Sequence, residues 1–251
     1  LGAVPLVPEE SESYTAGVVW TPTDTTSVTL DYYHIKIDDR LALLTNTIGP
    51  AEVADLIAAG IPPAEANLLL GSNANFFVNG FDSTVKGFDL AIGSRFSVPA
   101  GDLGVELRHN HNKQDVTNVA AGTINASRVF DLEHQTPNDR TLLTFDYSTN
   151  TLFSGLVRFA YYGDWDTTAG LFSPGDASDQ YHYSDNILVD LEARFAIGDH
   201  FKVTVGGENI FDTKPDQEQD PVANFLGVRP ALTSPFGVNG AFWYARTTFT
   251  F

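Results

Sequence analysis

The chain has 251 residues, a formal net charge of −18 at pH 7, and neither Cys nor Met. The absence of Cys excludes disulfides, thiolate metal ligands and catalytic thiols, and the negative charge makes nucleic acid an unfavourable partner. Aromatic residues make up 12% of the chain, too many for a disordered acidic protein. No stretch of about 18 consecutive apolar residues exists, so the sequence predicts no transmembrane helix.

Alternation of apolar and polar residues predicts strands along most of the chain. In residues 153–165 the odd positions are mostly aromatic or apolar, whereas the even positions include Arg158 and Asp164. The same period of two predicts nine strands. In chain order they cover residues 11–21, 26–39, 80–98, 102–114, 139–149, 151–166, 184–198, 200–211 and 240–251. Most reach the length of about 9–11 residues that a tilted strand needs to cross a bilayer.

The connections between these strands alternate in length. Short turns are expected near residues 21–25, 99–101, 149–151 and 198–200, and long loops at about 40–79, 115–138, 167–183 and 212–239. Tight turns on one side and long loops on the other are typical of an antiparallel transmembrane β-barrel. We therefore predict an all-β chain that forms part of such a barrel, with a soluble β-domain as the alternative.

A strand with one apolar and one polar face fits a soluble sandwich as well as a barrel. The barrel is favoured because the predicted strands are long and their outer faces carry many aromatic residues. The charged residues on the polar face are Arg95, Glu106, Arg108, Arg158, Asp190, Glu192, Arg194, Lys202 and Glu208.

The first long loop is predicted to contain two helices. Pro50 suits the first turn of a helix and Gly60 suits its C-terminal end, and a second short helix is expected over residues 63–70. These helices would form a packed lid that stabilises the loop or, alternatively, part of a substrate vestibule.

The loop at residues 164–185 holds the candidate ligand-binding residues, which are Trp165, Tyr181, His182 and Tyr183. They stand among several aspartates, and aromatic rings beside carboxylates can stack on sugars or hold polar ligands. The alternative is an ordinary interfacial girdle within a solvated loop.

Metal and catalytic signals are weak. His109 and His111 share one face of a strand and could bind a metal, but they continue an apolar row toward the outer rim, which favours an interfacial position. The acidic segment 212–220 lacks the carboxylate spacing of helix–loop–helix calcium sites, and no motif of a hydrolase, metalloprotease or nucleotide-binding enzyme is present. We expect no metal, no cofactor and no enzymatic activity.

The chain ends on an aromatic strand, FWYARTTFTF, at residues 242–251. A terminal Phe251, with Phe249 two residues before it, resembles the assembly signal of bacterial outer-membrane proteins, which the barrel-assembly machinery reads. The resemblance implies that Phe251, Phe249 and Trp243 belong to this signal. Thr247 departs from it, since the family often has a larger apolar residue there.

The preceding segment, GGENIFDTKPD at residues 206–216, resembles the penultimate-strand motif of TonB-dependent receptors. Asn209, Ile210, Phe211 and Asp212 occupy the motif positions, with Ile in place of Leu. The first 41 residues, and FFVNGFDSTVKGFDLAIG at residues 76–93, are also similar to this family. The resemblance covers most of the chain.

The resemblance implies a 22-stranded barrel with an N-terminal plug. Nine strands are an odd number, whereas single-chain bacterial barrels have an even number, and the chain does not begin with Met. We therefore expect residues 1–251 to be the C-terminal part of one barrel domain, with the plug and about thirteen strands outside it.

The function implied is TonB-dependent active uptake of a scarce nutrient, such as an iron–siderophore, a cobalamin or an oligosaccharide, across the outer membrane. The implied partners are the TonB complex, reached through an N-terminal segment outside this chain, the barrel-assembly machinery, lipopolysaccharide, outer-membrane lipid and the nutrient itself. The alternatives are a passive diffusion channel, a soluble glycan-binding β-domain and an outer-membrane hydrolase.

Overall fold

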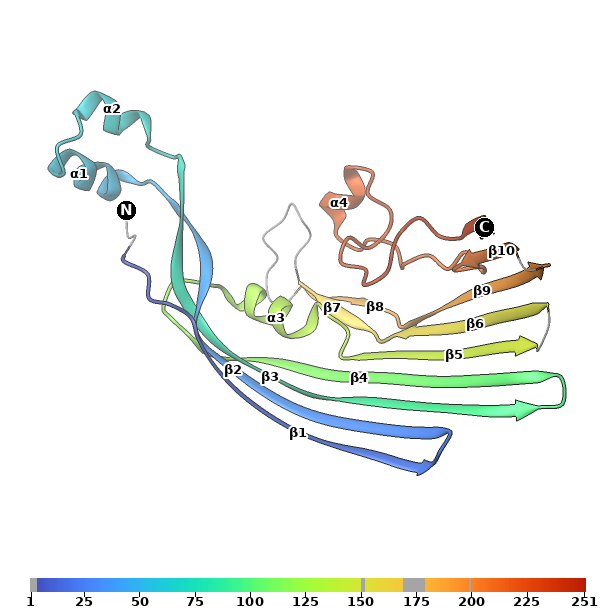
Figure 1. Cartoon of the computed structure of the whole chain (residues 1–251). Helices are drawn as coiled ribbons and strands as arrows, with labels where there is room; N and C mark the ends of the chain where they lie inside the picture. Colours follow the sequence, from blue (N-terminus) through green and yellow to red (C-terminus); the bar gives the residue numbers. More distant parts are fainter. Residues whose placement is uncertain (1–3, 150–151, 169–178, 199) are drawn as a thin grey trace. The chain divides into compact units, whose positions relative to one another are not determined.

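A computed structural model of the chain describes residues 4–149, 152–168, 179–198 and 200–251. Nine strands form one sheet in the order β1-β2-β3-β4-β5-β6-β9-β10-β11, so neighbours in the sheet follow one another along the chain (Figure 1). The prediction of nine strands in an all-β fold is confirmed. Strands β1 and β11 are the two edges of the sheet in the described part of the chain.

The strands of this sheet differ in length. Their bounds are β1 Glu10–Thr23, β2 Thr26–Thr47, β3 Asn73–Val98, β4 Gly101–Val119, β5 Asp139–Thr149, β6 Phe153–Tyr162, β9 Asn186–Ile197, β10 Phe201–Glu208 and β11 Phe242–Phe249. The connections alternate between short and long, as predicted. In an antiparallel sheet of consecutive strands, every second connection lies at the same end.

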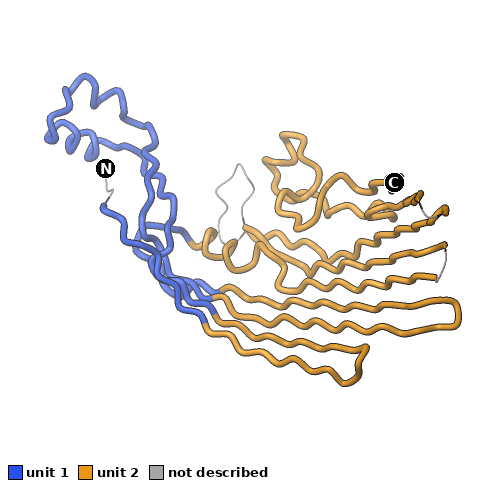
Figure 2. Tube along the Cα trace, viewed as in Figure 1, with its two compact units in different colours: residues 1–13, 35–84, 115–125 blue, residues 14–34, 85–114, 126–251 orange. Residues whose placement is uncertain are grey.

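The contacts divide the chain into two units, and each of the strands β1, β2, β3 and β4 runs through both (Figure 2). Unit 1 comprises Leu1–Ser13, Ile35–Thr84 and Asp115–Asn125, and unit 2 comprises Tyr14–His34, Val85–Gln114 and Ala126–Phe251.

Unit 1 contains the two predicted helices, α1 Pro50–Ala58 and α2 Pro63–Leu68. Pro50 occupies the first turn, and Gly60 has a φ of 97° just beyond the end of α1, as expected for a glycine that stops a helix. Ile48, Val53 and Ala66 form a small core beneath the helices. The loop expected at 40–79 is shorter than predicted, because β2 and β3 continue to Thr47 and from Asn73, respectively.

Unit 2 contains most of the sheet, and its strands present two different faces. Along β6, Val157 and Phe159 lie on an outer face, opposite Phe145 and Leu143 of β5. Arg158 lies on the other face, the inner face, together with Asp190 of β9. Successive strand residues point to opposite sides of a sheet, so one face is apolar and the other is charged, as predicted.

The long connections of unit 2 carry elements that the alternation pattern did not predict. These are the helix α3 Ala126–His134, a two-stranded sheet of β7 Trp165–Thr167 and β8 Tyr181–Tyr183, and the short helix α4 Pro221–Phe225. The strand predicted at 151–166 is therefore two strands, since β6 ends at Tyr162 and β7 begins at Trp165. None of the helices in the described ranges is long and apolar enough to cross a membrane.

Candidate functional site

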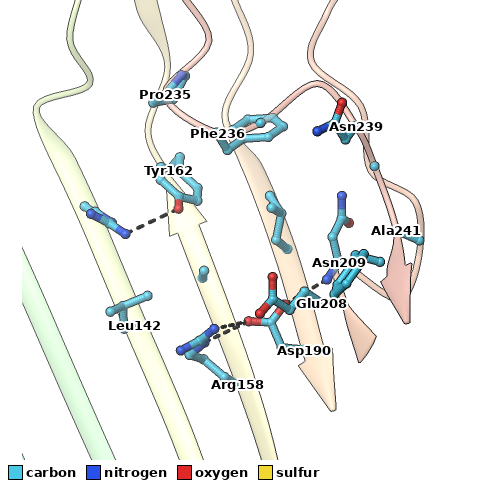
Figure 3. Close-up of a pocket in the computed structure, with 16 residues that line it drawn as sticks. Leu142, Arg158, Tyr162, Asp190, Glu208, Asn209, Pro235, Phe236, Asn239 and Ala241 are labelled. Atoms are coloured by element: carbon cyan, nitrogen blue, oxygen red, sulfur yellow. Dashed lines mark hydrogen bonds and ion pairs between the residues drawn. The ribbon is translucent and has the colours of Figure 1, made fainter. Parts of the chain in front are cut away.

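A cavity of about 630 Å³ lies on the inner face of unit 2 (Figure 3). Its floor comes from β5, β6, β9 and β10, and its roof comes from the connection that leads into β11. The lining residues are Arg140, Leu142, Arg158, Ala160, Tyr162, Leu188, Asp190, Glu208, Asn209, Pro235, Phe236, Gly237, Asn239, Gly240, Ala241 and Phe242. We call this cavity the inner pocket.

The motif at residues 209–212 holds the roof of the inner pocket in place. Asn209 is buried and has a φ of 50°, in the left-handed region that Asn tolerates better than most residues. Its side-chain amide donates to the backbone oxygen of Thr213 at 2.8 Å, and the Thr213 amide donates back to Asn209 Oδ1 at 2.9 Å. Asn209 thereby turns the chain away from β10 at the end of the strand.

Asp212 closes the same turn against the start of the last strand. Its Oδ1 accepts hydrogen bonds from the Ala241 amide at 2.9 Å and from Lys214 Nζ at 3.0 Å. The Ala241 amide and then Lys214 lower the pKa of Asp212 from its usual value. Phe211 is exposed, and the Ile210 amide donates to the backbone oxygen of Val189. Asn209, Ile210 and Asp212 therefore shape the turn that leads into the roof.

An ion pair lies on the floor of the inner pocket. Arg158 donates to Asp190 Oδ2 from Nε at 2.8 Å and from Nη2 at 2.6 Å. Asp190 Oδ1 accepts the backbone amide of Asn209 at 2.8 Å. Both oxygens of Asp190 are thus occupied, and the pair ties β6 and β9 to the turn after β10.

Two other charged residues that line the inner pocket have no oppositely charged partner among the described residues. Arg140 lies over the Tyr162 ring, 5.0 Å from its centroid, and donates to the Tyr162 hydroxyl at 3.3 Å. The Glu208 side chain makes neither an ion pair nor a hydrogen bond with any of the described residues. The alternation of charged and apolar residues predicted Glu208 on the inner face. It did not identify Arg140, although Arg140 stands at an even position of β5, like Asp146.

The candidate ligand-binding residues of the 164–185 loop are close together but differ in burial. Trp165 is 2% exposed, Tyr183 is 0% exposed, and their rings stack at 5.3 Å between centroids. Both rings pack against Ala231, and Trp165 Nε1 donates to Thr233 Oγ1 at 2.9 Å. Tyr181 is half-buried at the edge of this cluster. Their packing leaves very little of the Trp165 and Tyr183 rings accessible to a ligand.

A buried carboxylate, which the sequence reasoning did not single out, completes this cluster. Glu218 accepts hydrogen bonds from the Tyr183 hydroxyl at 2.8 Å, the Leu232 amide at 3.0 Å and the Asp220 amide at 3.1 Å. Burial raises the pKa of Glu218, but the backbone amides and the Tyr183 hydroxyl outweigh it and lower that pKa below its usual value. Burial and the same carboxylate raise the pKa of Tyr183.

His182 points away from the cluster and is exposed. Its Nδ1 lies 2.7 Å from Asp166 Oδ1, and this hydrogen bond raises the pKa of His182. Residues 169–178 of the candidate loop lie outside the described residues.

Helix α3 is attached to β7 by a second buried carboxylate that was also missed. Asp131 Oδ1 accepts from Thr167 Oγ1 at 3.0 Å, from the Thr168 amide at 2.7 Å and from Thr168 Oγ1 at 3.1 Å. The loops of unit 2 therefore form a structure with its own hydrogen-bonded core.

The residues of the expected assembly signal lie on or just after β11. Trp243 and Phe249 are exposed and paired with Gly207 and Phe201 of β10, and Phe251 follows the end of the strand. The Trp243 ring covers Gly207, where an added Cβ would lie 2.7 Å from Trp243 Cε3. Recognition by an assembly machinery stays a prediction.

The two histidines of β4 are engaged by protein groups. His109 Nδ1 lies 2.8 Å from Thr141 Oγ1 and His111 Nδ1 lies 2.8 Å from Asp139 Oδ1, while both rings pack on Phe88. Within the described ranges, no group of three or more metal-ligating side chains is found.

Comparisons with known proteins agree with this architecture. The family model of the TonB-dependent receptor-like β-barrel matches residues 1–210. No curated protein sequence matches the chain.

Several solved structures share the fold at low sequence identity. The outer-membrane transporter YddB from Escherichia coli has a TM-score of 0.66 and 9% identity, over 98% of this chain and 33% of its own. The iron transporter FrpB from Neisseria meningitidis has a TM-score of 0.62 and 14% identity, over 96% and 31%. The pyoverdine receptor FpvA from Pseudomonas aeruginosa, solved with pyoverdine bound, has a TM-score of 0.59 and 16% identity, over 98% and 30%.

The chain spans about a third of the length of these structures. The likenesses show the fold of an outer-membrane β-barrel, and all three proteins are described as transporters or receptors. The family model covers most of the chain, and Asn209 and Ile210 are the last two residues of the matched region. The chain belongs to the TonB-dependent receptor β-barrel family.

Proposed function

We propose that residues 1–251 are the C-terminal part of the barrel of a TonB-dependent transporter, which takes up a scarce nutrient across the outer membrane. The observation that carries this proposal is the inner pocket, which lies on the charged face of the sheet beneath the 209–241 connection. A pocket that combines apolar side chains with a few convergent polar groups is the usual form of a small-molecule site. In this proposal the plug and the TonB-contacting segment precede residue 1, and barrel-assembly machinery, lipopolysaccharide and lipid are the further partners.

The nutrient classes proposed from the resemblance are an iron–siderophore, a cobalamin and an oligosaccharide. FrpB is described as an iron transporter and FpvA was solved with pyoverdine, which supports a chelate among them. Tyr181 and His182 remain the more accessible candidates for ligand contact in the 164–185 loop, whereas Trp165 and Tyr183 would act by holding that loop in shape.

The proposal is tested by measuring whether nutrient uptake depends on the TonB complex. The full-length protein that contains this chain is expressed in cells that lack other routes for the tested nutrient, and uptake is measured with and without a functional TonB complex. Accumulation against a gradient that stops when TonB is removed is expected. Uptake that continues without TonB and only equilibrates the two sides would instead indicate a passive diffusion channel.

A further inference from the structure

We propose that the inner pocket binds a short, zwitterionic, peptide-like ligand, with an ammonium group at Glu208 and a carboxylate at Arg140. The inference rests on the proposed uptake function and specifies the ligand chemistry of the same site. Two charged side chains carry it, because they lie on either side of an apolar row of the pocket floor and neither has an oppositely charged partner among the described residues.

Glu208 supplies the negative end of the inner pocket. Gly207 pairs with Leu191, so Glu208 stands beside Asp190 of the neighbouring strand. Adjacent carboxylates repel each other, and Arg158 neutralises only Asp190, to which it donates twice. The remaining negative charge would be stabilised by a cationic group of the ligand. Phe242, which pairs with Glu208 across the strands, adds a ring face that also attracts cations.

Arg140 supplies the positive end. Its guanidinium is oriented by the Tyr162 ring and by the single hydrogen bond to the Tyr162 hydroxyl. The other N–H groups of the guanidinium fork have no partner among the described residues. A guanidinium binds a carboxylate through two parallel hydrogen bonds, so a terminal carboxylate is the matching ligand group.

An apolar row of the floor separates Arg140 from the row that holds Arg158, Asp190 and Glu208. Leu142 of β5, Ala160 of β6 and Leu188 of β9 lie in one register row across the three strands. The Phe236 ring from the roof packs at 5.4 Å from the Tyr162 ring above this floor. Such a surface suits aliphatic side chains rather than a densely hydroxylated molecule.

The spacing of the two ends sets the ligand length. Arg140 lies in the row of Asn186, whereas Glu208 lies beside Asp190, four residues further along β9. Strand geometry separates their Cα atoms by about 14 Å across the sheet and about 13 Å along it. An extended peptide of about four or five residues, roughly 13–18 Å long, matches this separation once the lengths of the two side chains are subtracted. The cavity of about 630 Å³ lies within the usual range for small-molecule sites.

The charges distinguish this ligand from the other classes. A neutral oligosaccharide would leave Arg140 and Glu208 unpaired, and a ligand with only negative charge would be repelled by Glu208 beside Asp190. An iron chelate fits the inner pocket only if it carries both a cationic and an anionic end.

Calorimetric titration of the purified full-length receptor tests the inference. The probes are tetraalanine with free ends, its N-acetylated form, its C-amidated form and maltotriose. Free tetraalanine is expected to bind, and each blocked form is expected to bind roughly tenfold more weakly or worse, because each loses one charged hydrogen-bonded contact.

Substitutions of Glu208 and Arg140 test which end of the peptide each residue binds. For the Glu208→Gln variant, N-acetylation of the peptide is expected to have no further effect on affinity, whereas C-amidation still weakens binding. For the Arg140→Gln variant, C-amidation is expected to have no further effect, whereas N-acetylation still weakens binding. Glu106→Gln, on the inner face outside this pocket, is the matched control and is expected to behave as wild type. Equal binding of free and blocked peptides, binding of maltotriose alone, binding of no probe, or peptide binding that neither variant changes would each overturn the inference.

An uptake experiment separates this inference from the proposed function. Peptide binding with the expected variant pattern, but without TonB-dependent uptake of tetraalanine, would uphold the pocket chemistry and contradict the transport proposal. TonB-dependent uptake of another nutrient by a receptor that does not bind tetraalanine would uphold transport and overturn the peptide-like ligand.

Discussion

The ring of Tyr244 on β11 covers Gly206 on β10, its direct partner in the sheet. A Cβ at position 206 would lie 2.5 Å from Tyr244 Cζ and Oη. The hydroxyl reaches past β10 and donates to Glu192 Oε2 on β9 at 2.5 Å. One side chain thereby connects the last three strands of the sheet, and Gly206 leaves the space for it.

Gly206→Ala is expected to displace the Tyr244 ring and break its hydrogen bond to Glu192. Overpacking of this kind costs about 1–3 kcal/mol. The measurement is the temperature at which the purified barrel loses its folded mobility on a gel. Gly93→Ala, also in a strand, is the control, because its Cβ would meet no atom closer than Ser27 Oγ at 3.7 Å. Equal effects of the two substitutions would contradict the role assigned to Tyr244.

Asn209→Ala is expected to destabilise the turn after β10 by about 2–3 kcal/mol, from two lost hydrogen bonds and the strain of a positive φ. Asn209→Gly removes the same hydrogen bonds but tolerates the backbone angle, so it is expected to cost about 1 kcal/mol less. Urea unfolding of the barrel in lipid vesicles measures both. A glycine variant as unstable as the alanine variant would show that the backbone angle contributes nothing.

Val157→Arg and Leu156→Arg test which face of β6 meets lipid. Val157 lies on the apolar outer face, opposite Phe145 and Leu191, whereas Leu156 lies on the inner face, opposite Asp146 and Glu192. An arginine on the lipid face near the bilayer centre costs about 2–4 kcal/mol. Refolding into vesicles should therefore fall for Val157→Arg and change little for Leu156→Arg. The opposite order would reverse the assignment of the two faces.

Tyr183→Phe is expected to loosen the loop cluster around Trp165. The substitution leaves the buried carboxylate of Glu218 without one of its donors, at a cost of about 1–3 kcal/mol. Trp165 fluorescence, recorded in a background with every other tryptophan of the protein, including Trp20 and Trp243, replaced by Phe, should shift to longer wavelength as water enters. Tyr181→Phe is the comparison, and an equal shift in both variants would contradict a specific role for the Tyr183 hydroxyl.

The same cluster is expected to open in acid. The pKa of Glu218 is lowered in the folded state relative to about 4.3 in the unfolded chain, so its contribution to stability is complete above about pH 4.3. That contribution is lost as the pH falls through the folded-state pKa. Hydrogen exchange of residues 216–232 should therefore accelerate below about pH 4 in the wild type. Glu218→Gln should exchange faster at neutral pH and show a weaker acid dependence; an unchanged acid dependence would point to another group.

Much of this architecture follows from local rules. Period-two alternation identifies the nine strands and the charged inner face, since side chains on a strand alternate sides whatever the rest of the chain does. The alternation of short and long connections, the two helices of the first loop and the motif at residues 209–212 are equally visible in the sequence. The even positions in their strands are enough to place three charged residues on one face, namely Arg158, Asp190 and Glu208.

The tertiary structure decides which residues of that face meet and which become buried. Trp165 and Tyr183 looked accessible, because loops are usually solvated, but contacts with Ala231 and Glu218, far along the chain, bury them. The extra length of β2 and β3 and the short elements α3, β7, β8 and α4 depend on such distant partners as well. The inner pocket arises only when residues 235–242 fold back over β5, β6 and β9. Periodicity describes the neighbours along one strand, whereas a pocket depends on contacts between segments that the sequence keeps apart.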